Sequence, residues 1–145
     1  MEADRALSRL GEYQRRIAHI IVAARDALAG DSASGQKTVA GARWELVRIL
    51  REYQLFKHTE IFDPLIAYGD SVRATNASRL KTRCIDLGQS YGDHVQRWSL
   101  QAPMNAWDDY RDEALTMIER INRHLGDEAE QVARLLVGVG RTRIG

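Results

Sequence analysis

The sequence predicts an all-α protein, namely an up-down-up-down four-helix bundle that forms a single domain over residues 1–145. Four long segments carry apolar residues at the spacing of one helix face. Connections rich in Gly, Ser, Asn or Pro separate them, and no segment alternates with the period of a β-strand. The predicted helices span about 5–29, 38–67, 77–98 and 104–137, and connections of roughly 6 to 12 residues favour antiparallel neighbours.

The helix predicted over 5–29 has one apolar arc, and His19 lies opposite this arc among charged residues. His19 is therefore expected to face solvent. The connection GDSASGQ at 30–36 follows this helix. The residues expected to face inward are Leu10, Tyr13, Ile17, Ile20, Ile21, Ala24 and Leu28.

The helix predicted over 38–67 places His58 on its apolar side. Glu60 and Asp63 project to the far side of an ideal helix. Pro64 clashes with the carbonyl four residues earlier and distorts this turn, which leaves open whether Glu60 or Asp63 turns inward. The residues expected to face inward are Val47, Leu50, Leu55, Ile61, Phe62, Leu65 and Ile66.

The third and fourth helices follow connections predicted at 68–78 and 98–105, with Pro103 at a position where a helix can begin. The fourth helix is expected to stop at Gly138 and Gly140. Inward residues of the third helix are Leu80, Cys84, Leu87, Tyr91, Val95 and Trp98, with His94 beside them. Those of the fourth are Met117, Ile118, Ile121, Leu125, Ala129, Val132, Leu135 and Leu136, with Glu128 among them and His124 at the edge.

The composition is that of an ordinary globular domain, with 44% hydrophobic and 28% charged residues and a formal net charge of +1. This balance excludes a nucleic-acid scaffold, which needs a concentrated basic surface. The longest apolar run, IIVAA, is too short to span a membrane, and the charged N-terminus lacks the apolar core of a secretory signal. The single cysteine, Cys84, has no disulfide partner within the chain. We therefore expect a soluble, cytoplasmic protein.

The pair His124 and Glu128 is the clearest candidate for metal chemistry. A spacing of four residues puts an imidazole nitrogen and a carboxylate on one helix face, within reach of a single ion. An inward Glu128 also requires a partner, because an unpaired buried carboxylate is costly. The alternative is a hydrogen-bonded His/Glu pair without metal, and His94 judged alone fits a satisfied histidine at the edge of the core better than a ligand.

The chain resembles the hemerythrin-like (HHE cation-binding) family, whose members are four-helix bundles with a non-haem di-iron centre. The segment HLGDEAEQVARLL at 124–136 is similar to the last-helix motif of the family, and WDDYRDEALTMIERI is similar to the approach to that helix. YGDHVQRW is similar to the third helix, and LGEYQRRI to the first. The resemblance implies helices that carry in turn a His, a His-x-x-x-Glu, a His and a second His-x-x-x-Glu.

The resemblance also implies a set of site residues, with two departures from the family pattern. Gln14 stands where the first histidine is expected. If Pro64 is aligned with the proline that often ends the family's second helix, Gln54 and His58 take the positions of the second-helix pair. The implied metal ligands are His58, His94, His124 and Glu128, with Gln14, Gln54, Tyr13 and Tyr91 as pocket neighbours.

The implied cofactor is non-haem iron in a mononuclear or partial di-iron site, with zinc or manganese as further metals for three histidines and one glutamate. The implied function is metal binding, or sensing of oxygen or another small ligand. The alternative is a metal-free bundle in which Gln14, Gln54, His58 and Glu128 form a buried hydrogen-bond network. Such a protein would act through a protein partner or as a homodimer, with Trp44, Trp98 and Trp107 as candidate anchors.

No catalytic constellation is evident in the sequence. Ser90, Asp93 and His94 lie on one predicted helix, where the acid cannot sit behind the imidazole as a triad requires. The stretch HTEIFDPL is faintly similar to the phosphoacceptor box of sensor kinases, but an inward His58 argues against that role. We therefore expect no enzymatic activity.

Overall fold

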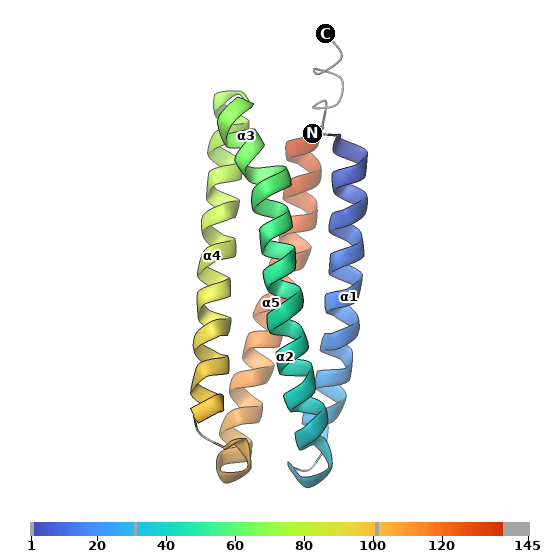
Figure 1. The fold of residues 1–145 in the computed structure, drawn as a ribbon, viewed down its shortest axis with the longest axis vertical. Helices are drawn as coiled ribbons and strands as arrows, with labels where there is room; N and C mark the ends of the chain where they lie inside the picture. The colour runs from blue at the N-terminus through green and yellow to red at the C-terminus, as the bar shows by residue number, and fades with distance from the viewer. Residues whose placement is uncertain (1, 31, 101, 138–145) are drawn as a thin grey trace.

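The computed structural model describes residues 2–30, 32–100 and 102–137, and within them it is helical throughout apart from short turns. Successive long helices run in opposite directions along the long axis of the molecule (Figure 1). Helix α1 contacts α2 and α5, and α4 contacts α5 and α2, so each long helix has two long neighbours. The prediction of an all-α chain with four long helices is confirmed. These are α1 (Ala3–Ala29), α2 (Ser32–Lys57), α4 (Ser71–Leu100) and α5 (Trp107–Leu136), with the short elements η1 (His58–Phe62), α3 (Asp63–Tyr68) and η2 (Pro103–Ala106).

The connections are much shorter than the sequence predicts. Helix α2 already begins at Ser32, so the loop predicted at 30–36 is wrong. Gly35 permits a close helix crossing instead, because a Cβ atom there would lie 2.4 Å from the carbonyl oxygen of Ala27. Helix α4 begins at Ser71, so the loop predicted at 68–78 is wrong as well. Asp70 caps α4, since its Oδ1 accepts a 2.9 Å hydrogen bond from the backbone nitrogen of Arg73.

The third connection is close to its predicted position. Helix α4 continues to Leu100, and Pro103 begins the 3₁₀ turn η2 that leads directly into α5. Helix α5 ends at Leu136, whereas the predicted stop residues Gly138 and Gly140 lie outside the described residues. No helix within the described ranges is both long and apolar enough to cross a membrane.

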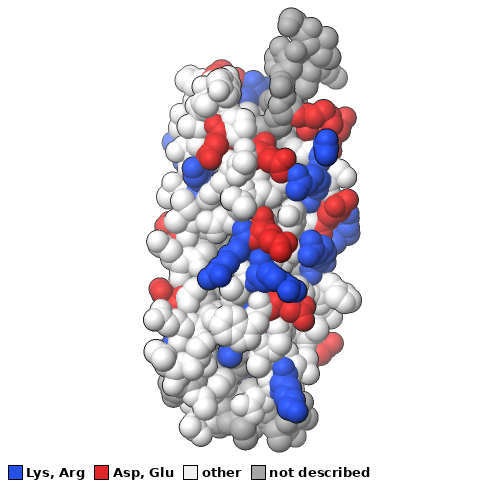
Figure 2. All heavy atoms as spheres, viewed as in Figure 1, with Lys and Arg blue, Asp and Glu red and all other residues white. Residues whose placement is uncertain are grey.

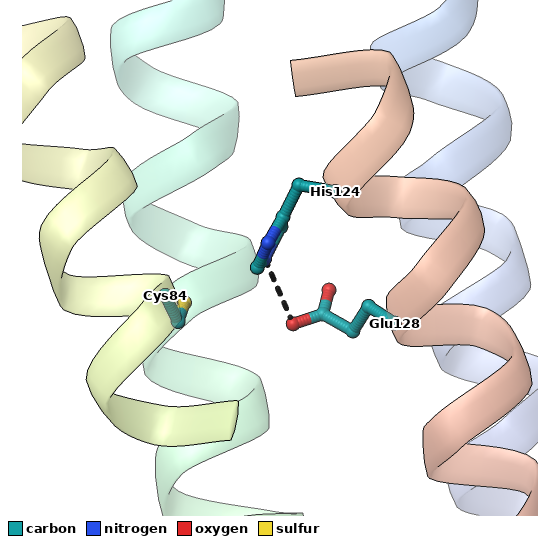
Figure 3. A group of neighbouring side chains, drawn as sticks. All are labelled: Cys84, His124 and Glu128. Atoms are coloured by element: carbon teal, nitrogen blue, oxygen red, sulfur yellow. Dashed lines mark ion pairs between the residues drawn. The ribbon is translucent and has the colours of Figure 1, made fainter. Parts of the chain in front are cut away.

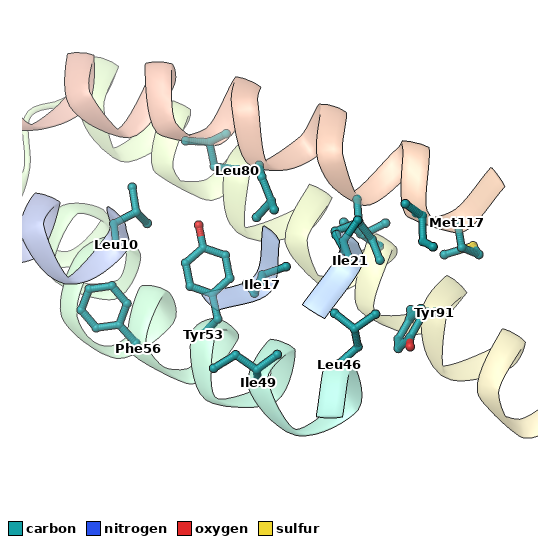
Figure 4. Packing of buried hydrophobic residues seen from close by; sticks show 14 of the residues in the cluster. Leu10, Ile17, Ile21, Leu46, Ile49, Tyr53, Phe56, Leu80, Tyr91 and Met117 are labelled. Carbon is teal, nitrogen blue, oxygen red and sulfur yellow. The ribbon is translucent and has the colours of Figure 1, made fainter. Parts of the chain in front are cut away.

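One hydrophobic cluster fills the space between the long helices and draws residues from all of them (Figure 4). The inward residues predicted for the first, third and fourth helices are buried or half-buried, and His19 is exposed as predicted. Trp98 is buried, Trp107 is half-buried and Trp44 is 55% exposed. The helical periodicity of these three segments therefore identifies their core faces correctly.

In the second predicted helix, the residues that face the core are shifted by one position from those predicted over most of its length. Leu55 and Ile66, both predicted to face inward, are 68% and 39% exposed. The cause is η1, a π-helical turn that inserts one extra residue just before Pro64 and shifts the phase of the helix. A single wheel drawn through 38–67 averages the two phases. It places Ile61, Phe62 and Leu65 correctly but misplaces the half before the turn. The buried residues are Leu46, Ile49, Tyr53, Phe56 and Lys57 before the turn, and Ile61, Phe62 and Leu65 within and after it.

Candidate functional site

A fully buried carboxylate, that of Glu128 on α5, lies at the centre of the candidate site. Lys57 at the end of α2 is 2% exposed, and its Nζ lies 2.8 Å and 3.0 Å from the two carboxylate oxygens. The hydroxyl of Tyr53, one turn earlier, donates a 2.5 Å hydrogen bond to Oε1 of Glu128. The ammonium also lies 4.0 Å from the centroid of the Tyr53 ring, within cation–π distance. The negative charge of Glu128 is thus neutralised inside the protein by a lysine.

Two further side chains complete the centre from α4 and α5 (Figure 3). The Nζ of Lys57 lies 3.0 Å from the sulfur of Cys84. The Nε2 of His124 lies 3.2 Å from Oε2 of Glu128 but forms no hydrogen bond of good geometry, so this contact is chiefly electrostatic. Cys84, His124 and Glu128 place their donor atoms within 4.8 Å of one another.

Gln14 links the centre to α1. Its Nε2 donates 3.0 Å hydrogen bonds to the hydroxyl of Tyr53 and to the backbone carbonyl of Leu125. With Gln14, every long helix contributes to one polar network inside the core. The contributions are Gln14 from α1, Tyr53 and Lys57 from α2, Cys84 from α4, and His124 and Glu128 from α5.

The electrostatics of the centre favour a carboxylate surrounded by donors. Burial raises the pKa of Glu128, but the charges of Lys57 and His124 and their contacts outweigh it and lower the pKa to about 2. Burial lowers the pKa of His124, but contacts with Cys84 and Glu128 outweigh it and raise the pKa to about 9. Burial and the charge of Glu128 raise the pKa of Tyr53, which keeps the phenol protonated as a donor.

The structure brings His124, Glu128 and Gln14 together, whereas Gln54 and His58 do not reach the centre. Tyr53 and Lys57 occupy the inward positions of α2, each one residue before the residue expected there. Gln54 and His58 instead line a groove between α2 and α4. His58 is half-buried, its Nε2 has no hydrogen-bond partner among the described residues, and burial together with Lys81 and Lys57 lowers its pKa.

Pro64 does not turn either nearby acid toward the centre. Glu60 forms an ion pair with Arg9, and Asp63 accepts a 2.6 Å hydrogen bond from Lys81. Both carboxylate side chains are about half exposed, at 47% and 52%. Within the described residues, Glu128 therefore provides the only carboxylate of the centre.

His94 belongs to a separate polar cluster. It lies ten residues after Cys84 on α4, which is about 15 Å along the helix axis. Its Nδ1 is 2.7 Å from Oε2 of Glu113, a carboxylate that also accepts hydrogen bonds from Arg97 and Trp98. Burial lowers the pKa of His94, and the contact with Glu113 only partly opposes this. His94 is a satisfied buried histidine.

The two tyrosines expected near a metal have other partners. Tyr13 packs its ring against those of Tyr53 and Phe56, with centroids 5.6 Å and 5.4 Å away. Tyr91 donates a 3.2 Å hydrogen bond to the carbonyl oxygen of Arg43. Tyr13 is thus next to the centre through Tyr53, whereas Tyr91 helps to hold α4 against α2.

The donor set does not fit a di-iron centre. Such a centre requires several histidines and two carboxylates, but the described residues here supply one histidine, one carboxylate and one thiol within reach. The ammonium of Lys57 is bonded to two of these three groups. The ammonium of Lys57 therefore already contacts two of the atoms that would bind a metal ion.

Sequence reasoning missed Lys57, Tyr53 and Glu113. Lysine is seldom fully buried, whereas Lys57 is. A regular helical wheel through 38–67, which ignores the π-helical insertion, also places Lys57 outside the apolar arc. The available signal was the conflict within the segment itself, because Leu46, Ile49 and Tyr53 recur at helical spacing in a different phase from Ile61 and Leu65.

A groove of about 780 Å³ runs between α2 and α4 on the other side of α2 from the centre. Exposed Leu55 and Trp44 belong to its lining, together with Ile85 and the two small residues Gly88 and Gly92. On the face drawn in Figure 2, charged side chains of both signs gather mainly over α1 and the middle of α2, and few lie between α2 and α4. The groove is therefore predominantly apolar.

Comparisons of the chain with protein-family models, with curated proteins and with solved structures found no match. Function is therefore inferred from the geometry of the buried centre and of the groove.

Replacing Lys57 alone is expected to destabilise the protein more than replacing the pair. Lys57→Met leaves the Glu128 carboxylate buried without a cation and should cost about 3–5 kcal/mol of unfolding free energy. Adding Glu128→Gln removes that charge while keeping an acceptor for Tyr53, and should recover a large part of the loss. Urea unfolding measures both effects. The exposed pair provides the control, since Lys81→Met should cost less than about 1 kcal/mol. Equal costs for single and double variants would contradict a buried charge pair.

The raised pKa of His124 predicts a specific pH dependence. A group whose pKa is higher in the folded state stabilises that state fully below its unfolded pKa, here about 6.5, and this contribution is lost as pH rises through about 9. The unfolding free energy of the protein should therefore fall over this range relative to His124→Gln, by at most about 3 kcal/mol. Urea unfolding at several pH values tests this, with His19→Gln as the exposed control. A constant difference from pH 6 to 9.5, a window of roughly three units, would refute it.

Proposed function

We propose that the protein is a hemerythrin-like up-down-up-down four-helix bundle in which a lysine has replaced the metal centre, and that it acts as a metal-independent interaction protein. The observation that carries this proposal is the Lys57 ammonium bonded to both oxygens of Glu128. It supplies the positive charge that metal ions supply in the family that the sequence resembles. The centre thereby becomes a structural element with no need of a cofactor.

The distribution of polar residues supports the resemblance. The family pattern has one ligand on the first helix, two at i and i+4 on the second, one on the third and two at i and i+4 on the fourth. The polar network here has the same distribution, with Tyr53 and Lys57 as the second-helix pair and Cys84 on the third long helix. Only His124 and Glu128 keep the residue types of the pattern.

The groove between α2 and α4 is the surface that we assign to interaction, with a second copy of the chain as its occupant. A two-fold dimer needs a surface that is complementary to itself. This surface has both the projections and the hollow that self-complementarity requires. Apolar side chains project beside the groove, and small residues leave space within it. Leu55 and Trp44 project, at 68% and 55% exposure, and a Cβ atom at Gly92 would meet nothing within 4 Å. A net charge of +1 imposes little repulsion between two copies.

Metal removal is expected to leave the protein unchanged. Protein purified without chelator and then exposed to ferrous iron under anaerobic conditions should retain less than about a tenth of an equivalent, and a chelator should not alter its thermal stability. Elemental analysis by mass spectrometry measures the first quantity and calorimetry the second. A matched pair of variants, His124→Ala with Glu128→Ala against exposed His19→Ala, identifies any bound metal. Stoichiometric metal lost only in the first variant would support the second candidate function, a metal held by Cys84, His124 and Glu128 after Lys57 moves away.

Self-association should depend on the groove. Sedimentation of the purified protein is expected to show a concentration-dependent dimer, and Leu55→Glu should weaken it at least about tenfold by placing a charge in the apolar contact. Val22→Glu is the control, since Val22 on α1 is similarly exposed, at 58%, but lies outside the groove. A monomer at all concentrations, or equal weakening by both variants, would overturn the assignment of this surface.

A further inference from the structure

We propose that Lys57 and Cys84 form a redox-sensitive covalent crosslink, in which hydrogen peroxide oxidises the sulfur and the lysine amine then captures it in a sulfur–nitrogen bond. The inference goes beyond the proposed function and does not depend on whether two copies associate. It concerns a modification site that joins α2 to α4 in the interior of the protein.

The first ground is proximity. The Nζ of Lys57 and the Sγ of Cys84 are 3.0 Å apart, although the residues are 27 positions apart in sequence and lie on different helices. Lys57 is 2% exposed and Cys84 5% exposed, so neither side chain is free to move away into solvent. An amine held against a thiol in this way is the nearest nucleophile once the sulfur becomes electrophilic.

The second ground is the environment of the pair. The thiol is the only one in the chain, so an oxidised sulfur has no second cysteine with which to form an intramolecular disulfide. Burial also limits the access of bulky thiols, whereas hydrogen peroxide is little larger than water. A sulfenic acid formed here must therefore either react with a neighbouring nitrogen or be oxidised further.

The reaction balances with one equivalent of peroxide. The thiol sulfur attacks one peroxide oxygen, which gives a sulfenic acid and one water, so sulfur is oxidised and peroxide is reduced. The Lys57 ammonium, hydrogen-bonded to the carboxylate of Glu128 at 2.8 Å, releases one proton to solvent by way of that carboxylate. The free amine attacks the sulfur, the S–O bond breaks, and the hydroxyl leaves with one of the two amine protons as a second water, while the other proton stays on the nitrogen.

The product differs from the starting state in charge as well as in connectivity. The lysine loses its positive charge while Glu128 stays ionised, so the Lys57–Glu128 ion pair disappears and His124, 3.2 Å away, remains as the neighbouring cation. A covalent bond then links α2 to α4 at the end of α2, beside the groove that these two helices form. In the unfolded chain a dithiol can reduce the bond, which restores the free amine and the thiol.

The test is intact-mass measurement and peptide mapping of the folded protein after a few molar equivalents of hydrogen peroxide. The expected result is a loss of about 2 Da, a tryptic peptide that joins the sequences around Lys57 and Cys84, and recovery of the original mass when dithiothreitol is added after unfolding in urea. Cys84→Ser and Lys57→Arg should show no such loss, and Lys57→Arg should instead gain oxygen. Lys81→Arg, at a half-buried lysine that pairs with Asp63 outside the centre, should behave as the unaltered protein.

Two results would overturn the inference. One is a gain of about 16 or 32 Da on Cys84 without a joined peptide, which means oxidation without capture. The other is no change in mass under peroxide that readily oxidises the urea-unfolded chain, which means that the folded protein shields the sulfur. Circular dichroism establishes whether each variant is folded, and the joined peptide in the unaltered protein decides the question even if Lys57→Arg fails to fold.

Discussion

A single buried charge, the carboxylate of Glu128, imposes the main constraint on this structure. It has no exposed surface, so every interaction that it loses with water must be replaced by protein. Lys57 is the counter-ion of the carboxylate, and Tyr53 donates a hydrogen bond to it. Gln14 in turn donates a hydrogen bond to the tyrosine hydroxyl and holds it in place. Because these groups come from α1, α2 and α5, satisfying one carboxylate also aligns three helices along their axes. We interpret the network as a register constraint that apolar packing alone would not impose.

The π-helical turn η1 determines which residues of α2 take part. Without its extra residue, the regular spacing that buries Leu46, Ile49 and Tyr53 would not bring Ile61 and Phe62 into the same core. The turn therefore separates α2 from the continuation toward α3 at the very point where Lys57 ends the regular helix. Single π turns inside helices are frequent at functional sites, because they re-aim side chains at little cost to the remaining hydrogen bonds. Lys57 continues the inward face of α2 that Tyr53 and Phe56 form, and the turn begins at His58, which lines the groove.

Helix α2 has two different environments on its two sides. One side closes the polar centre with an internal cation, and the other side exposes apolar residues around the groove shared with α4. The Lys57–Cys84 contact is the point at which these environments meet, since it joins the same two helices that form the groove. A covalent bond at this contact would therefore tie together the two helices that form the groove. The second polar cluster, around His94 and Glu113, lies farther along α4 and does not share this connection.

The sequence alone determined the number of long helices, the core faces of α1, α4 and α5, and the inward position of Glu128 near His124. These follow from local periodicity, which a regular helix converts directly into a buried face. The identity of the partner of Glu128 was decided only by the tertiary structure. A one-residue π insertion is invisible to a regular helical wheel, and it exchanges Gln54 and His58 for Tyr53 and Lys57 at the centre. The short connections were also decided by packing. Gly35 allows α2 to approach α1 closely, whereas the Gly- and Ser-rich composition of this segment had predicted a loop.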